Sequence, residues 1–167
     1  AGIGVITRRD LEEINWAVLW MVAGGFALGV ALNETGLAAN LINSIPFNTW
    51  PVLAVLIGSG VICYTLSNFI SNTATAALLV PILAVVGKSM TAELAPIGGV
   101  ACLLIGIAVA ASVAMILPIS TPPNALAHGT GMIEQKYMAK SGLIMGVIGL
   151  VLGYVMLVLL GSIGFFG

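Results

Sequence analysis

Charge is what this sequence lacks most. Only 7% of its 167 residues are charged and 60% are hydrophobic, whereas soluble domains carry about 25% charged residues. No Asp, Glu, Lys or Arg occurs from Thr35 to Gly87. A chain with so little polar surface cannot cover a soluble globule, and its long apolar runs predict an all-α protein embedded in the lipid bilayer. The net charge of −1 does not favour a nucleic-acid partner.

Reactive side chains are also scarce. The two cysteines, Cys63 and Cys102, lie in separate apolar runs, and we expect both to be buried free thiols. No cluster of residues has the spacing of a metal site or of a nucleophile with its base. The sequence therefore does not predict an enzyme.

The first apolar run, residues 14–33, is long enough to cross a membrane. Residues 36–46 are too short to cross, and their apolar positions recur every three to four residues. This pattern predicts a helix lying in the membrane interface. Two further long runs, 96–117 and 142–166, predict two more spanning helices.

The segment between these runs carries three adjacent polar residues, Ser71, Asn72 and Thr73. An apolar run that begins at Pro51 leads into them, and residues 74–86 follow. As a helix, that second piece rises only about 20 Å, against about 30 Å of hydrocarbon. We therefore expect a re-entrant helical hairpin with its tip at residues 71–73. The first arm is long enough to cross fully, so a complete crossing stays open.

A second interruption follows in "LPISTPPNALAHG", where Pro118, Pro122 and Pro123 oppose helix continuation. We expect a discontinuous transmembrane helix that breaks at residues 118–124 and resumes from residue 124 to about residue 140.

Polar groups at membrane depth are costly unless they are satisfied, and broken helices are tolerated there around a binding cavity. The helix that restarts after each break presents free N–H groups, which favour an anion, and the freed carbonyl groups favour a cation. Two such breaks are typical of a secondary transporter. A simple helix cap formed by the cluster Ser71, Asn72 and Thr73 and a proline kink at the second break remain alternatives. His128 shares a helix face with Asn124, and both proton coupling and packing are open for it.

The stretches "SNTATAALLVPI" and "ILPISTPPNALAHG" resemble the divalent anion:sodium symporter family, as does "INWAVLWMVAGGFALGVALNETGLA". That family transports dicarboxylates, citrate and sulfate. The resemblance places the chain in the C-terminal half of an inverted-repeat transporter, without its N-terminal repeat.

The resemblance also implies two groups of site residues. A substrate carboxylate would be bound by the hairpin tip and the second break, namely Ser71, Asn72, Thr73, Thr121 and Pro122. Sodium, the expected coupling ion, would be held by side-chain and main-chain oxygens of Ser67, Ile70, Asn72 and Ser120.

The same resemblance implies a division of the chain into three parts. Residues 1–46 would belong to a scaffold, residues 47–140 to the moving transport region, and residues 141–167 would form the final transmembrane helix. The family fold implies a homodimer. The expected function is sodium-coupled transport of a divalent anion, with succinate as the most favoured C4-dicarboxylate. A cation-independent exchanger and a non-transporting fragment or accessory subunit remain alternatives.

Basic residues indicate the orientation. Arg8, Arg9, Lys136 and Lys140 fall on one side of the expected topology and Lys88 on the other. The excess of positive charge predicts that the first side is cytoplasmic. We therefore expect an integral protein of a bacterial inner membrane with its C-terminus outside.

Overall fold

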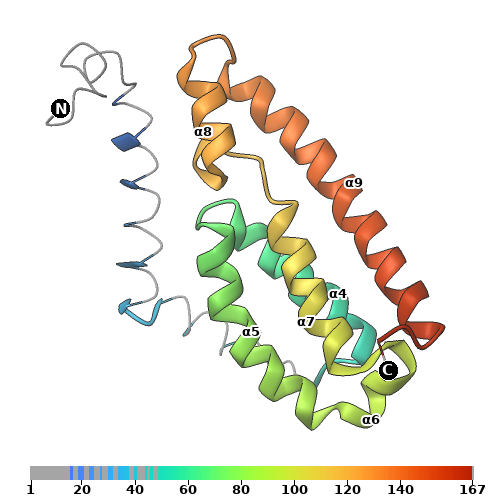
Figure 1. The fold of residues 1–167 in the computed structure, drawn as a ribbon. Helices are drawn as coiled ribbons and strands as arrows, with labels where there is room; N and C mark the ends of the chain where they lie inside the picture. The colour runs from blue at the N-terminus through green and yellow to red at the C-terminus, as the bar shows by residue number, and fades with distance from the viewer. Residues whose placement is uncertain are drawn as a thin grey trace, which may run out of the picture.

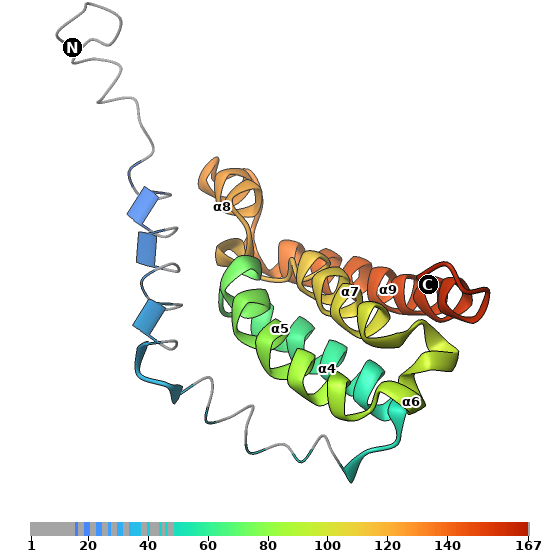
Figure 2. The ribbon, with the colours of Figure 1, turned by 60° about the horizontal axis from the view of Figure 1, so that its bottom comes forward.

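The computed structural model describes residues 49–166 throughout and, before them, positions 16, 19, 20, 23, 24, 27, 30, 31, 34–37, 40, 44 and 46. Every regular element from residue 52 to residue 162 is a helix. The helices pack side by side around α7, with the C-terminus near α6 and the start of α8 at the opposite end (Figures 1 and 2). This all-helical architecture agrees with the class expected from composition.

The first two of these helices form a hairpin. Helix α4, Val52–Ser67, has 16 residues, and α5, Asn72–Ser89, has 18. A turn over residues 68–71 joins them (Figure 1). Ser71 caps α5 because its hydroxyl oxygen accepts a hydrogen bond from the Ala74 N–H at 3.2 Å.

Helix α5 is longer than the expected arm over residues 74–86. Its 18 residues rise about 27 Å, which is close to the thickness of the hydrocarbon core. The prediction that this arm is too short to cross is therefore wrong. The Ser71 cap brings Asn72 and Thr73 into the first turn. At the other end the helix continues through Lys88, whose long side chain can reach a polar boundary from an apolar helix.

The predicted continuous helix over residues 96–117 is also wrong. A short helix α6, Thr91–Leu94, and a 3-10 turn η2, Ala95–Ile97, precede α7, Gly99–Ser112. The axes before and after Gly98 differ by 69°. Gly98 and Gly99 have φ values of 98° and 67°, in the left-handed region that favours glycine, so the bend is built at this pair.

The second break lies earlier in the chain than the expected limits 118–124. Helix α7 ends at Ser112, a 3-10 turn η3 covers Pro118–Ser120, and α8 spans Pro122–Gly129. The helix thus resumes at Pro122, not at residue 124. Prolines are accepted in a first helical turn because their missing N–H groups would have no intrahelical partner there.

The predicted helical piece over residues 124–140 is replaced by two elements. After α8 a loop with Gly131 at φ 72° leads into α9, Gln135–Ser162. Lys136 in the first turn of α9 forms an ion pair with Glu134 at 2.8 Å. The last helix therefore begins before residue 141 and ends before residue 166.

Glycines form the face of α9 that packs on α7 and on the segment after it. A Cβ atom at Gly142 would overlap the Met115 carbonyl, and one at Gly153 would lie 2.6 Å from Val109. Gly146 and Gly149 in the same way face Val113. The four glycines recur every three to four residues, and this spacing in the sequence predicts one packing stripe. The structure confirms it, because backbone and side chains of residues 109–116 occupy the space above the glycines.

The core lies between α4, α5, α7 and α9 and includes Leu56, Leu79, Leu103 and Ile107. Cys63 and Cys102 are fully buried and unpaired, as predicted. In the described part of the chain, α5 and α9 are long and apolar enough to cross a membrane, and the bent pair ending in α7 is a third candidate. These lengths and compositions agree with a membrane protein.

The structure says less about the expected N-terminal elements. All described positions from residue 16 to residue 34 are helical. The limits of the predicted helix over residues 14–33, most of the interfacial helix over residues 36–46, and Arg8 and Arg9 lie outside the described residues.

Candidate substrate and cation site

The two polar interruptions of the chain meet at one end of the helix bundle. The turn between α4 and α5 lies beside the segment that leads into α8 in both ribbon views (Figures 1 and 2). Hydrogen bonds join them: the Ile116 N–H donates to Asn68 Oδ1 at 2.8 Å, and the Ser120 hydroxyl donates to the Asn68 carbonyl at 3.1 Å. Residues far apart in sequence therefore form one polar cluster.

The hairpin tip presents the start of α5. Ser71 is the N-cap, Asn72 is half-buried and Thr73 is exposed. The N–H groups of a first helical turn lack intrahelical partners and carry a partial positive charge. Since no Asp, Glu, Lys or Arg lies near them in sequence, these dipoles are the tip's own means of attracting an anion.

Oxygen atoms converge directly behind the tip. The hydroxyl of Ser67, which is fully buried, lies 2.6 Å from Asn72 Oδ1 and 3.3 Å from the carbonyl oxygen of Ala111. A hydroxyl group has one proton, so it can donate to only one of these two acceptors at a time. The carbonyl of Ala111 belongs to the last turn of α7, where a helix carries partial negative charge. A group of neutral oxygens with this polarity suits a small hard cation.

The structure brings Ser67, Asn72 and Ser120 into this cluster. Ser120 is 3% exposed and reaches the turn through its bond to Asn68. Ile70 is 5% exposed and lies within the turn. Hydroxyl, amide and main-chain oxygens are ligands that can replace the water molecules around a sodium ion. The oxygen atoms of these four residues therefore fit the expected ion.

A cavity of about 520 Å³ opens beside the tip, between α5 and α7. Asn72 and Thr73 line its polar part. Its other walls are small or branched apolar residues and one serine: Ala76, Ala77, Val80, Ala108, Ala111 and Ser112. The volume lies within the usual range for small-molecule sites, about 300–1,000 Å³, and two of the predicted substrate residues face it.

The other three predicted substrate residues do not line this cavity: Ser71 caps α5, and Thr121 and Pro122 lie at the start of α8. Thr121 uses its hydroxyl oxygen to cap α8, accepting from the Asn124 N–H at 3.3 Å. Pro122 is exposed at the first position of α8. Within residues 49–166, no hydrogen bond joins Thr121 to Ser71, Asn72 or Thr73. The tip and the start of α8 are thus two separate helix N-termini on either side of the Asn68 link.

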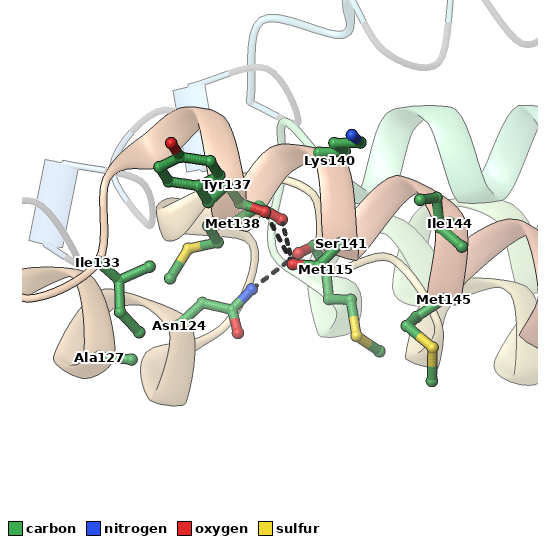
Figure 3. A pocket seen from close by; sticks show the side chains of 11 residues that line it. Met115, Asn124, Ala127, Ile133, Tyr137, Met138, Lys140, Ser141, Ile144 and Met145 are labelled. Carbon is green, nitrogen blue, oxygen red and sulfur yellow. Dashed lines mark hydrogen bonds between the residues drawn. The ribbon is translucent and has the colours of Figure 1, made fainter.

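A second cavity, of about 650 Å³, lies between the break, α8 and the first turns of α9. Figure 3 shows Asn124 reaching from α8 towards the backbone of Met115. Its amide nitrogen donates to the carbonyls of Met115 at 2.9 Å and Leu117 at 3.4 Å. Asn124 therefore holds the unwound segment in place. Nδ1 of His128 lies 3.1 Å from the carbonyl oxygen of Ile133, which assigns His128 a contact in the loop after α8.

Two polar residues have surroundings that the sequence did not predict. Asn68 belongs to the polar cluster before the tip, but sequence alone does not show that it bridges to residues 116 and 120. Thr75 is fully buried, and its hydroxyl has no hydrogen-bond partner within residues 49–166. Their only signal in the sequence is a polar side chain close to an interruption in an apolar run.

Helix starts and oxygen clusters meet here at breaks in otherwise apolar helices, an arrangement that is typical of membrane transporters. Residues 5–164 match the family model described as the sodium:sulfate symporter transmembrane region. The chain belongs to this family, which confirms the resemblance stated above.

Related proteins have transporter names. The chain is 37% identical over 148 residues to an uncharacterized transporter of Haemophilus influenzae, covering 87% of this chain and 31% of that protein. It is 36% identical over 163 residues to the sodium-dependent dicarboxylate transporter SdcS of Staphylococcus aureus, covering 94% and 30%. It is 34% identical over 151 residues to the Na(+)/dicarboxylate cotransporter 3 of Rattus norvegicus, covering 87% and 23%. The chain thus spans less than a third of the length of these relatives.

Proposed function

We propose that this chain forms the C-terminal part of a secondary transporter that moves a divalent organic anion together with sodium. The observation that carries the proposal is the meeting of Ser67 Oγ, Asn72 Oδ1 and the Ala111 carbonyl directly behind the start of α5. An oxygen cluster for a cation and a helix N-terminus for an anion then share one residue, Asn72. Two relatives that are named as sodium-dependent dicarboxylate transporters support the same reading.

In this proposal Ser67, Asn72 and the main-chain oxygens of Ile70 and Ser120 would hold sodium. The bound ion would supply a positive charge that the chain itself lacks at this place. Asn72 and Thr73 would orient one carboxylate group of the anion at the tip, with Ser71 fixing the turn. Thr121 and Pro122 would present the start of α8 to the other part of the substrate.

The names of two relatives specify a dicarboxylate. We propose a C4-dicarboxylate such as succinate as the substrate, with citrate and sulfate as the competing anions. Hydroxyl groups and backbone N–H groups serve all three, so the choice depends on the distance between the binding groups. Because the chain spans 23–31% of its relatives, we propose that an N-terminal repeat supplies the rest of the substrate site and that the transporter is a homodimer.

The place of the site in the membrane is part of the same proposal. The buried polar turn and the unwound segment 113–121 suit mid-membrane depth, since irregular backbone is tolerated there inside protein. Although α5 is long enough to cross, we propose that the hairpin is re-entrant, because its polar tip would stay at that depth. Residues 1–46 would belong to a scaffold, and residues 47–140 would move as the transport region. The C-terminus would lie outside a bacterial inner membrane.

Uptake into proteoliposomes tests the proposal. The full-length transporter that contains this chain is reconstituted, and entry of radiolabelled succinate is measured with an inward sodium gradient or with N-methyl-D-glucamine in place of sodium. We expect uptake only with sodium, reduced by unlabelled succinate more than by citrate or sulfate. Equal uptake with both cations would instead favour the cation-independent exchanger.

A further inference from the structure

Asn68 forms three hydrogen bonds through its side-chain amide and its main-chain carbonyl. Its side-chain nitrogen donates to the Tyr64 carbonyl at 2.8 Å within α4. Its side-chain oxygen accepts from the Ile116 N–H at 2.8 Å, and its main-chain carbonyl accepts from the Ser120 hydroxyl at 3.1 Å. Asn68 is 3% exposed. Of these three bonds, the last two therefore cross from the hairpin turn to the unwound segment after α7.

Two side-chain acceptors replace helical acceptors that the segment has lost. Because α7 ends at Ser112, the N–H groups of Ile116 and Leu117 have no helical acceptor. Asn68 Oδ1 accepts a hydrogen bond from the Ile116 N–H, and the Ser120 hydroxyl oxygen accepts one from the Leu117 N–H at 3.2 Å. The same Ser120 hydroxyl donates its proton to the Asn68 carbonyl. Side chains at positions 68 and 120 thus fix a stretch of backbone that has no regular structure of its own.

We propose that Asn68 is the positioning residue of the cation site. It holds the segment 116–120, and with it the main-chain oxygen of Ser120, in register with Ser67 and Asn72. The inference rests on the proposed function. Asn68 itself does not coordinate the ion, because its two oxygens face Ile116 and Ser120. Its neighbour Ser67 provides the oxygen that faces Asn72.

Sodium binding and anion binding should respond differently to the loss of Asn68. If Asn68 only stabilised the fold, its loss would weaken sodium binding and anion binding together. If it positions the Ser120 oxygen, its loss weakens sodium binding first. Anion binding then falls only as far as it depends on sodium, and saturating sodium restores it.

The experiment uses the purified full-length transporter, with sodium and succinate as probes. Sodium is titrated at fixed succinate and succinate is titrated at saturating sodium, for the unaltered protein and for Asn68→Ala. We expect Asn68→Ala to raise the sodium concentration for half-maximal binding roughly 5- to 100-fold, as for a buried donor left unpaired. Succinate affinity at saturating sodium should stay within about twofold, a change of only about 0.4 kcal/mol.

Two further variants keep the test decisive. Ser120→Ala keeps the main-chain oxygen but removes the bond to the Asn68 carbonyl, so it should shift sodium binding in the same direction. Combined with Asn68→Ala, it should add less than its separate effect, because both act on one segment. Thr65→Ala is the control: Thr65 is exposed, its hydroxyl bonds to Val61 within α4, and we expect no shift.

Amide exchange gives a readout that does not need transport. In Asn68→Ala the Ile116 N–H should exchange faster, while amides inside α7 stay protected. The inference is overturned if Ile116 exchanges faster and sodium affinity is unchanged. It is also overturned if sodium affinity at saturating succinate and succinate affinity at saturating sodium fall by the same factor. Succinate binding that ignores sodium in the unaltered protein would overturn the proposed function, whereas sodium dependence that survives Asn68→Ala unchanged overturns only the role of Asn68.

Discussion

The ring of Tyr154 in α9 lies directly over Gly60 in α4, so that a Cβ atom at Gly60 would overlap the tyrosine hydroxyl. The reverse contact occurs one layer away, where Tyr64 of α4 lies over Gly146 of α9. Each helix thus places a tyrosine on a glycine of the other. This exchange fixes both the spacing and the register of α4 against α9.

Gly60→Ala should destabilise the protein, because the added methyl group and the Tyr154 hydroxyl compete for one space. Overpacking of this kind costs about 1–3 kcal/mol. Thermal unfolding in detergent, followed by circular dichroism, measures the loss as a lower midpoint. Adding Tyr154→Phe should recover part of it, since the phenylalanine ring lacks the atom nearest to the new methyl group. No recovery in the double variant would contradict this contact.

Tyr154→Phe alone should leave stability unchanged or raise it. The Tyr154 hydroxyl is buried and has no hydrogen-bond partner within residues 49–166. Burying an unsatisfied polar group costs about 1–3 kcal/mol, so its removal relieves the folded state. The same unfolding measurement applies. A clear fall in the midpoint would show that the hydroxyl has a partner.

Sequence alone could predict the elements that depend on local chemistry. A helix cap within the cluster Ser71 to Thr73, the glycine face of α9 and the two buried thiols all follow from residue type and spacing. The bend before α7 does not, because hydropathy does not show that Gly98 and Gly99 take left-handed φ values. Nor does the early end of α7, since the bond from Ile116 to Asn68 joins positions that are distant in sequence.

The candidate site, too, could be predicted from the sequence only in part. Ser67, Asn72 and Ser120 come together at the breaks, yet the connecting residue, Asn68, is one polar residue among several before the tip. Sequence patterns identify where helices stop, but not which side chains satisfy the exposed backbone. Only the three-dimensional arrangement distinguishes a residue at the tip from one that ties the tip to another segment.

Asn72→Ala should weaken succinate binding more than Thr65→Ala. Asn72 lies in the candidate cavity and contacts Ser67, whereas Thr65 is exposed and bonds only within α4. A lost hydrogen bond to a charged group costs about 1.5–3 kcal/mol, or about 10- to 100-fold in affinity. Binding measured by scintillation proximity on the full-length protein checks this. Equal affinities in the two variants would remove Asn72 from the substrate site.

Cysteine placed at position 72 should react slowly with a membrane-impermeant maleimide, because we place the hairpin tip at membrane depth. Succinate should slow the reaction further. The native thiols, Cys63 and Cys102, are fully buried and give a low background. A cysteine at the exposed position 137 near the start of α9 serves as the reactive control, in inside-out vesicles whose cytoplasmic side faces the reagent. Labelling at position 72 as fast as at position 137, and insensitive to succinate, would place the tip at the surface.

Sodium and succinate should strengthen each other's binding by the same factor, as linkage requires. Opposite unit charges about 6 Å apart attract by about 3 kcal/mol at an effective dielectric near 20, and helix N-termini add about 0.3–2 kcal/mol each. We therefore expect sodium to tighten succinate binding about a hundredfold. Calorimetry in both orders of addition measures the two factors, and unequal factors would show that the two ligands do not share one equilibrium.

Helix α9 has a second face, opposite its glycines, that remains bare of protein within residues 49–166. Ile144, Val147, Ile148 and Val155 are all about half exposed along it. In water such a surface would drive the chain to aggregate. This face is stable in contact with hydrocarbon. An extraction that removes lipid faster than detergent replaces it should therefore make the protein aggregate through α9. Aggregation should begin before the polar cluster loses its structure.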